Sequence, residues 1–518
     1  MTHTVVFQPV NKTIRVPDGT TLSEAAKQAG VFIDSPCGGN GTCKKCAVTL
    51  LKGGVETNVL ACQTKVHSDC VVRLPEHSAV VTLNDGSSRY AAFAPYPAAH
   101  TDVPGACFAA FDLGTTTIVC YLLDAKTGGQ IAVSGMQNPQ SAFGADVIAR
   151  ATYALDVGYE PLRSSVRGAL NELLDSVCRQ AGRERKNVVL ASVVGNTVMH
   201  HLLLGYPVDS LVRAPYRPFK SERLILPASE LELYAHDSCV VLIPGVVGGF
   251  VGADTVGCLT STSFDTLRDA TLMLDVGTNG ELALTNGTRC VSCSTAAGPA
   301  FEGANISCGM RASSGAIEHA RFADHELEIG VIGNAPPSGL CGSGLIELAA
   351  ALVKAGIIEE SGRFCDGPGF QNRFVRLADG MKAFVVSPET AEHPQIVLTQ
   401  KDVRELQLGK AAMRAGIETL LSTLSLTPGQ VVKTLLAGAF GSHLSAESLC
   451  DIGLLPPSLL KSVESIGNAA GEGAKLYLRN YALFEQTDTL IKQTEYIELT
   501  MSAEFTDRYV DAMAFDGE

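Results

Sequence analysis

One pattern of apolar and polar positions occurs twice in the chain. A run of β-prone apolar residues ends in one Asp, and a Gly turn with hydroxyl or amide side chains follows. The first copy is residues 110–117 (AFDLGTTT) and the second is residues 274–280 (LDVGTNG). Each copy predicts a strand that runs into a tight hairpin.

The chemistry of these two turns suits a phosphate chain. Backbone N–H groups of a Gly turn converge on an anion, hydroxyl and amide side chains add donors, and the Asp can hold a cation. The candidate phosphate-binding residues are Gly114, Thr115 and Thr116 in the first copy and Gly277, Thr278, Asn279 and Gly280 in the second. A single copy is most often an ordinary hairpin, but two copies facing each other would grip a polyphosphate and its Mg²⁺ from both sides.

A third apolar run, residues 435–442 (LLAGAFGS), opens into small residues where an adenosine ring could approach the backbone. In this order, the three segments resemble the phosphate-1, phosphate-2 and adenosine motifs of the ASKHA superfamily of sugar kinases, Hsp70 and actin. The resemblance implies an α/β fold of two lobes over residues 107–518, with the lobe boundary near 265–272. It places Gly438, Ala439 and Gly441 against adenosine.

Other segments of this region carry candidates with open roles. Glu302 could orient an attacking water, although an N-cap or a salt bridge is the more common role of such a residue. Adjacent His200 and His201 point in different directions on a helix, so they are interpreted as structural. The charged positions of the helix predicted over 401–424, namely Arg404, Glu405 and Lys410, are expected to face solvent, and a face turned toward the nucleotide is the alternative. The segment 340–344 (LCGSG) is expected to let two helices cross closely, and 466–471 (IGNAAG) to floor the adenine pocket.

The first 77 residues predict a different domain. Residues 4–7 and 13–16 have the pattern of short strands, and residues 20–29 that of a capped helix ended by Gly30, as in a β-grasp fold. Four cysteines follow at C-x5-C-x2-C-x15-C spacing: Cys37, Cys43, Cys46 and Cys62. With the Gly-rich loop between them they strongly resemble the ligands of 2Fe–2S ferredoxins. A structural zinc site on the same cysteines is the alternative, and Cys70 is interpreted as a packed strand residue.

Residues 78–106 are Ala- and Pro-rich and predict a linker. It could let the cluster domain swing, or it could pack rigidly on the second domain.

Composition narrows the class of protein. Among 518 residues, 46% are hydrophobic and 51 are Gly, which fits a turn-rich α/β protein. The formal net charge of −14 argues against a nucleic-acid partner. No segment is long and apolar enough to span a membrane, and the N-terminal residues lack the features of a leader. A cytoplasmic protein with free thiols is expected.

Two other nucleotide signatures are missing. Residues 409–411 (GKA) lack the rest of a P-loop, and no G-x-G-x-x-G follows a strand, so neither NAD nor flavin binding is expected. A cluster in this chain would therefore take its electron from an external low-potential donor.

A ferredoxin domain followed by an ASKHA domain is similar to the reductive activators of corrinoid proteins. Segments 138–140 (NPQ), 195–200 (GNTVMH) and 341–344 (CGSG) resemble theirs. The resemblance implies ATP-dependent electron transfer from the cluster to Co(II) in the corrinoid protein of a methyltransferase system, restoring Co(I). It implies that Asp112 and Asp275 act on Mg²⁺ and the attacking water. Glu302, singled out above from its own position, is the third catalytic candidate. Some members have an extra domain after the linker, for which this chain has no room.

Two other functions remain open on the sequence. A small-molecule kinase of the acetate or sugar type could carry the cluster as a redox sensor, and an ATP-switched scaffold would not need the cysteines. A homodimer formed through the large domain is compatible with the sequence.

Overall fold

The structure is a computed structural model of the whole chain. It describes residues 2–8, 12–29, 31, 33, 46–52, 55–74, 92–323, 326–365, 370–391, 393–438, 444–500 and 502–515. Of the predicted site residues, Cys37, Cys43, Ala439 and Gly441 lie outside these ranges. No helix in the described ranges combines the length and apolar character needed to cross a bilayer.

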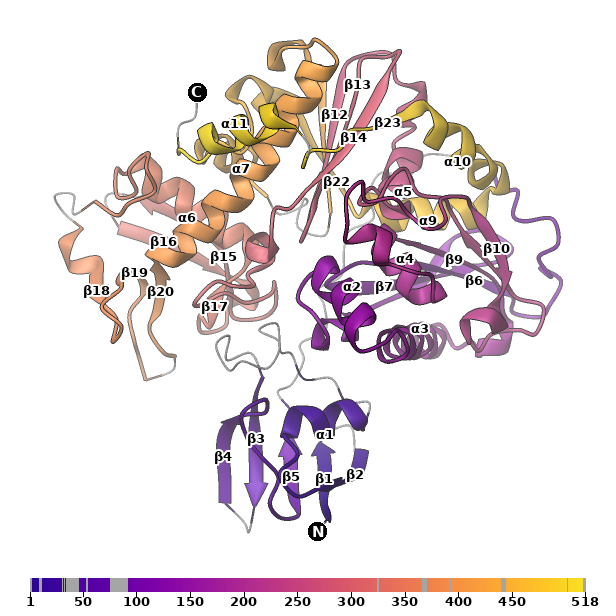
Figure 1. Cartoon of the computed structure of the whole chain (residues 1–518), viewed down its shortest axis with the longest axis horizontal. Helices are drawn as coiled ribbons and strands as arrows, with labels where there is room; N and C mark the ends of the chain where they lie inside the picture. The colour runs from indigo at the N-terminus through magenta and orange to yellow at the C-terminus, as the bar shows by residue number, and fades with distance from the viewer. Residues whose placement is uncertain are drawn as a thin grey trace.

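The N-terminal part is a five-stranded sheet in the order β2-β1-β5-β3-β4, with one helix packed on it (Figure 1). Its elements are β1 (Thr2–Gln8), β2 (Lys12–Pro17), α1 (Leu22–Gln28), β3 (Ala47–Lys52), β4 (Val55–Leu60) and β5 (Cys70–Arg73). Thr21 and Glu24 form a reciprocal cap at the start of α1. The predicted β-grasp fold is confirmed, and Cys70 is a strand residue packed at the edge of its core.

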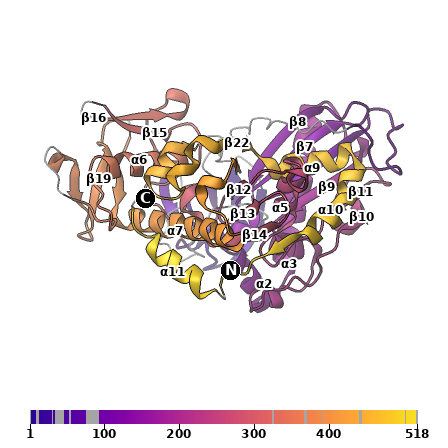
Figure 2. The ribbon, with the colours of Figure 1, turned by 90° about the horizontal axis from the view of Figure 1, so that it is seen from above.

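Two six-stranded sheets form the cores of two lobes that lie side by side (Figure 2). The first has the order β10-β11-β9-β6-β7-β8 and the second the order β22-β21-β12-β13-β14-β23. The first comprises β6 (Cys107–Leu113), β7 (Thr117–Asp124), β8 (Gln130–Gln137), β9 (Val188–Gly195), β10 (Leu224–Pro227) and β11 (Val240–Ile243). The second comprises β12 (Thr271–Val276), β13 (Gly280–Thr285), β14 (Cys290–Thr295), β21 (Lys433–Ala437), β22 (Val463–Gly467) and β23 (Thr494–Tyr496).

The two sheets share one topology. In each, an antiparallel meander (β6-β7-β8 or β12-β13-β14) joins, through its first strand, a parallel strand that comes later in the chain. The strands next to that junction are almost wholly apolar and buried, as sheets covered on both faces require. The two predicted phosphate hairpins therefore occupy equivalent positions in the two lobes.

Helices cover these sheets, and two small sheets extend the second lobe. The helices are α2 (Val147–Asp156), α3 (Glu160–Gln180), α4 (Thr197–Leu204), α5 (Ala253–Ser261), α6 (Gly342–Lys354), α7 (Gln400–Thr423), α8 (Ala446–Asp451), α9 (Ala469–Arg479), α10 (Tyr481–Gln493) and α11 (Ala503–Asp511). One small sheet contains β15 (Ala316–Ala323), β16 (Glu326–Val331) and β17 (Gly339–Leu340), the other β18 (Phe374–Arg376), β19 (Lys382–Ser387) and β20 (Ile396–Thr399).

Helices α9 and α10 lie in the sequence between two strands of the second sheet, β22 and β23, but pack on the first lobe (Figure 1). Their side chains share one buried cluster with strands β6 and β9, and the Ser192 hydroxyl of β9 donates to the Ala474 carbonyl at 2.8 Å. Helix α9 also crosses α5 closely, because a Cβ on Gly473 would lie 2.3 Å from the Gly257 carbonyl oxygen.

The structure corrects two sequence expectations. The glycines of segment 340–344 bring α6 close to the short 3-10 helix Pro299–Glu302 and to strand β15, not to a second α-helix: a Cβ on Gly342 or Gly344 would meet the backbone of Phe301 or Ile317. Lys410 does not face solvent either. It is fully buried in α7, donates to the Ala514 carbonyl and lies over the ring of Phe515, so the chain after α11 covers this face of α7.

The second part of the predicted linker is packed on the first lobe. Ala94 exchanges backbone hydrogen bonds with Arg479 and Tyr481 beside α9 and α10, and the Tyr96 ring contacts that of Tyr481. From residue 92 onward the connection is therefore packed on the ASKHA-like part of the chain, as the second of the two predicted alternatives requires.

Candidate functional site

Two hairpins bring the predicted phosphate loops together between the lobes. Asp112 is the penultimate residue of β6 and Asp275 that of β12, so each acid stands just before its turn. A Cβ on Gly114 would lie 2.6 Å from the Thr117 carbonyl oxygen, so the first turn requires glycine. Gly280 instead faces α7, where a Cβ would meet the Met413 sulfur at 1.8 Å.

A chain of hydrogen bonds crosses from one lobe to the other at these loops. The Thr278 hydroxyl donates to Glu302 Oε1 at 2.8 Å, so the Thr116 hydroxyl, 2.9 Å from Thr278 Oγ1, is the donor to Thr278. The other Glu302 oxygen, Oε2, is buried without a partner. Glu302 thus makes neither of the bonds expected of a helix cap or a salt bridge, and one carboxylate oxygen remains available for a ligand.

The first loop is held in place from behind by one amide side chain. Asn138 Nδ2 donates to the Gly114 carbonyl at 2.8 Å, and the Asn138 backbone N–H donates to the Thr116 carbonyl at 2.8 Å. Because both bonds leave the loop N–H groups unused, Asn138 shapes the loop without blocking its donors.

Carboxylates concentrate around the two loops. Burial raises the pKa of Asp112 to about 6, and the charge of Asp275 adds to this while a hydrogen bond from Asn468 opposes it. Burial likewise raises the pKa of Asp275 to about 6. The pKa of Asp254, at the start of α5, rises to about 7 through burial and the charges of Asp275 and Asp112. Burial and the charges of Asp254 and Asp275 also raise the pKa of Glu281.

This arrangement fits Mg²⁺ better than a metal enclosed by protein ligands. In the described ranges no three acidic, His or Cys side chains converge closely enough to coordinate one ion together. Mg²⁺ usually keeps several waters and takes one or two carboxylates plus phosphate oxygens, which Asp112 and Asp275 could supply with a nucleotide.

Asn468 belongs to the site although the sequence places it elsewhere. It caps α9 through a bond from the Gly471 N–H, and its Nδ2 donates to Asp112 Oδ2 at 2.8 Å, 356 positions away in the chain. Gly438 also lies against the second loop: its φ is +100°, and a Cβ there would meet Asp275 Oδ1 at 2.7 Å. The sequence predicts Asn468 only at the adenine pocket, because no local pattern links it to Asp112.

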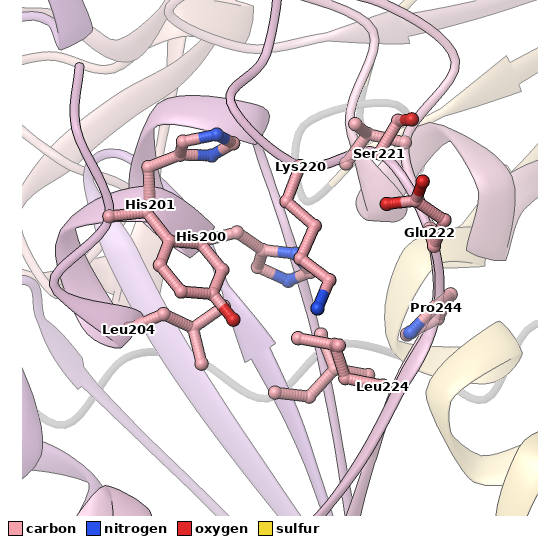
Figure 3. A pocket seen from close by; sticks show the side chains of 12 residues that line it. His200, His201, Leu204, Lys220, Ser221, Glu222, Leu224 and Pro244 are labelled. Carbon is pink, nitrogen blue, oxygen red and sulfur yellow. The ribbon is translucent and has the colours of Figure 1, made fainter.

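The two histidines are buried and neutral. His201 Nδ1 bonds to the Thr197 carbonyl at 2.8 Å and its Nε2 accepts from the Phe219 N–H, which is a structural role. Burial lowers the pKa of His200 to about 3. Both rings line a cavity of about 10 Å³ together with Lys220 and Glu222, which is no larger than one water needs (Figure 3).

Two of the four predicted cluster ligands are described, and they converge. The sulfurs of Cys46, just before β3, and Cys62, just after β4, are buried and lie 3.2 Å apart. Two thiols this close suit coordination of one metal, as a 2Fe–2S centre or the alternative zinc site requires. Gln63 Nε2 also donates to Cys62 Sγ at 3.6 Å.

Comparison with known proteins accounts for nearly the whole chain. Residues 5–67 match the 2Fe–2S iron–sulfur cluster binding domain, residues 107–267 the RACo middle region, and residues 269–518 the C-terminal ASKHA domain of RACo. The corrinoid activation enzyme RamQ of Eubacterium limosum is 30% identical over 98% of both chains. The [Co(II) methylated amine-specific corrinoid protein] reductase of Methanosarcina barkeri is 26% identical over 78% of this chain and 76% of its own.

A solved structure, the reductive activator for corrinoid, iron–sulfur protein, superposes with a TM-score of 0.75 at 29% identity, covering 99% of this chain and 98% of that one. The fold and the paired loops define a 2Fe–2S ferredoxin domain joined to an ASKHA ATPase domain. Within that class, the chain belongs to the RACo family, the reductive activators of corrinoid proteins. The ferredoxin match favours the 2Fe–2S cluster over zinc, and family membership favours the activator over the kinase and the scaffold.

Proposed function

We propose that ATP binding and hydrolysis between the two lobes drive an electron from the N-terminal cluster to the Co(II) corrinoid of a methyltransferase's corrinoid protein, restoring Co(I). The observation that carries this proposal is the bond chain from Thr116 through Thr278 to Glu302. It joins the two phosphate loops across the lobes, so a nucleotide that enters must change how the lobes meet.

Each predicted residue has a role in this proposal. Cys37, Cys43, Cys46 and Cys62 would hold the 2Fe–2S cluster, which supplies one-electron transfer when bound. The loops of residues 114–116 and 277–280 would bind the phosphates and Gly438, Ala439 and Gly441 would lie at adenosine. Asp112 and Asp275 would hold Mg²⁺, and Glu302 would accept a proton from the attacking water.

The difference in reduction potential between the cluster and its acceptor explains the need for ATP. For one electron, each tenfold unfavourable ratio corresponds to about 59 mV, or about 1.4 kcal/mol. A plant-type 2Fe–2S centre near about −400 mV would therefore reduce an acceptor of much lower potential only at a very small population. Closure of the lobes on ATP, coupled to a change at the acceptor, can offset that difference.

The partners follow from the same proposal. The corrinoid protein receives the electron, and an external low-potential donor supplies it, since the chain carries no dinucleotide-binding motif. The net charge of −14 disfavours binding to nucleic acid, which is itself a polyanion. We further propose a cytoplasmic location without membrane association, and a homodimer formed through the ASKHA domain.

The test is substitution of Asp112. Asp112→Ala is expected to lower ATP turnover by at least about 100-fold, because a nucleotide-bound Mg²⁺ loses a ligand, while the visible spectrum of the cluster stays unchanged. Formation of Co(I), followed by its absorbance with a candidate corrinoid protein and a chemical reductant, should fall with ATP turnover. Asp156→Ala, at the exposed end of α2, is the matched control and should behave as wild type. Unimpaired cobalt reduction by Asp112→Ala would refute ATP coupling.

A further inference from the structure

Helix α2 of the first lobe carries an unusual side chain in its first turn. The Arg150 side chain is fully buried. Its Nε donates to the Gly144 carbonyl at 3.0 Å, and its Nη1 contacts the Met199 sulfur at 3.4 Å. Its Nη2 is buried without a partner. Neither contact supplies a negative charge.

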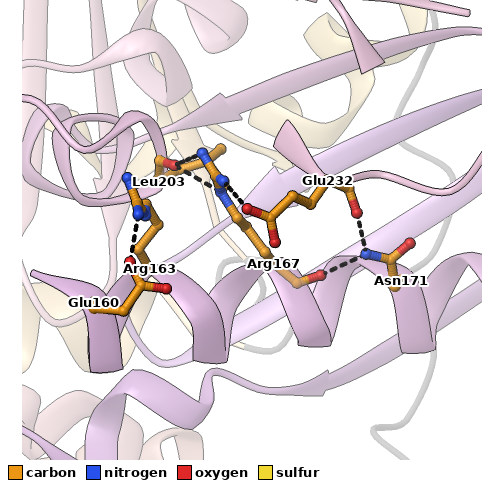
Figure 4. A network of polar contacts seen from close by, with 6 residues as sticks. All are labelled: Glu160, Arg163, Arg167, Asn171, Leu203 and Glu232. Atoms are coloured by element: carbon orange, nitrogen blue, oxygen red, sulfur yellow. Dashed lines mark hydrogen bonds and ion pairs between the residues drawn. The ribbon is translucent and has the colours of Figure 1, made fainter. Parts of the chain in front are cut away.

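Arg167, on α3 of the same lobe, is a buried arginine with a structural role, and its guanidinium has a full set of partners (Figure 4). Its guanidinium forms an ion pair with Glu232 at 2.7 Å, and its other nitrogens donate to the Leu203 carbonyl at 3.2 and 3.3 Å. Burying a guanidinium without an anion is costly, and proteins normally supply one. Arg150 lacks that partner, so packing alone does not explain it.

The surroundings of Arg150 connect it to the phosphate loops. The Met199 sulfur that it contacts also receives Asn138 Nδ2 at 3.8 Å, and the same amide holds the Gly114 carbonyl of the first loop. Two carboxylates, Asp146 and Glu302, act on the Arg150 charge without touching it, and burial lowers the Arg150 pKa only to about 10, so it stays charged. Asp146 is engaged in capping α2.

Glu302, from the second lobe, has a buried carboxylate oxygen without a partner, which complements the buried cation of Arg150. Its Oε1 is bonded to Thr278 of the second phosphate loop, and its Oε2 has no partner. A buried cation of one lobe, on which the Glu302 charge acts, and a buried carboxylate oxygen of the other lobe both have unused bonding capacity. Both lie beside the loops predicted to hold the phosphates.

We propose that the Arg150 guanidinium binds the terminal phosphoryl group of the nucleotide, opposite Glu302. This inference rests on the proposed function and adds a residue to it. In hydrolysis, a bond forms between the water oxygen and the terminal phosphorus, and the bond from that phosphorus to the β–γ bridging oxygen breaks. The water proton passes to Glu302 Oε2, ADP leaves with the bridging oxygen, and Arg150 offsets the charge on the oxygens of the transferring group.

The test measures which phosphate the arginine recognises. Titration calorimetry with Mg²⁺ compares ADP, a non-hydrolysable ATP analogue, and inorganic phosphate added to the ADP complex, for wild type and Arg150→Gln. Charge-assisted hydrogen bonds to phosphate predict that Arg150→Gln binds the ATP analogue about 10- to 100-fold more weakly and ADP within about twofold of wild type. Loss of phosphate binding to the ADP complex would show that the released phosphate uses the same site.

Two further variants control for folding. Arg167→Gln removes a buried arginine from the neighbouring helix and should lower the melting temperature while keeping the preference for the ATP analogue over ADP. Arg150→Lys keeps the positive charge without the guanidinium fork, and should keep ADP affinity while binding the analogue at least about fivefold more weakly than wild type. It carries the test if Arg150→Gln does not fold.

The outcomes separate the two proposals. If wild type binds neither nucleotide, the proposed function fails. If wild type hydrolyses ATP but both Arg150 variants keep its preference for the ATP analogue over ADP, or lose both ligands equally, only the role of Arg150 is overturned.

Discussion

Gln63 lies next to the fourth predicted cluster ligand and donates its side-chain N–H to that ligand's sulfur. Hydrogen bonds to cluster sulfurs favour the reduced, more negative form and so raise the reduction potential. Gln63→Leu is expected to lower the cluster potential by roughly 20–60 mV, the equivalent of one net hydrogen bond for a one-electron couple.

A redox titration of the purified protein, followed by its electron paramagnetic resonance signal, measures this shift. Asn58→Leu removes an amide from an exposed position of the same sheet and should leave the potential unchanged. An unchanged potential in Gln63→Leu would show that this contact does not tune the cluster.

Residues with a local signature could be predicted, and residues assembled by the fold could not. Asp112, Asp275 and the loop residues have a signature because a strand, an acid and a Gly turn are consecutive in the chain. Asn468 has none, since it meets Asp112 only after α9 packs on the first lobe. The expectation that Lys410 faces solvent is wrong for a related reason: the chain segment that covers this side chain lies 104 positions away in the sequence.

Elements were predicted best where periodicity is strong and worst where small residues can pack in several ways. The β-grasp strands and the two phosphate hairpins were expected from apolar runs and turn residues. Glycines of the segment 340–344 suggested a helix crossing, but the crossing occurs at Gly257 and Gly473. A glycine pattern indicates a close approach of backbones and does not say which backbone approaches.

The crossing of α5 and α9 gives a prediction of its own. Gly473→Ala is expected to destabilise the protein by about 2–4 kcal/mol, because its Cβ would lie 2.3 Å from the Gly257 carbonyl oxygen and the helices would have to separate. Since Asn468 caps α9 and donates to Asp112, nucleotide affinity should fall as well.

Thermal unfolding by circular dichroism measures the first effect and calorimetry the second. Gly429→Ala, with no atom within 4 Å of its new methyl group, is the control and should be neutral. A neutral Gly473→Ala would mean that the two helices can shift apart freely.

The whole molecule concentrates acids where its lobes meet, which makes its stability depend on pH. The folded-state pKa of Asp112 and of Asp275 is about 6 and that of Asp254 about 7, against an ordinary value of 3.8 for each. The folded state therefore binds more protons than the unfolded chain between about pH 4 and 7. These groups contribute most stability below that window, and their contribution is lost as pH rises through the folded-state pKa values.

Asp254→Asn tests this. Removing one of three mutually repelling acids should raise the stability of the nucleotide-free protein at pH 8 by about 1–3 kcal/mol, a few degrees in melting temperature, with little effect at pH 4. Melting temperatures between pH 4 and 8 measure the difference from wild type. Asp156→Asn, exposed on α2, should show no such trend, and an equal shift of Asp254→Asn at both pH values would contradict the argument.

The return of α9 and α10 to the first lobe has a consequence for how the protein is made. Strands β6 and β9 leave the ribosome early, but the helices that cover their inner face are encoded between residues 469 and 493. Until those residues emerge, the nascent chain exposes a buried surface that includes Phe108, Leu190 and Leu242. Translation must therefore pass residue 493 before the first lobe can close, which leaves a chaperone a long interval in which to bind it.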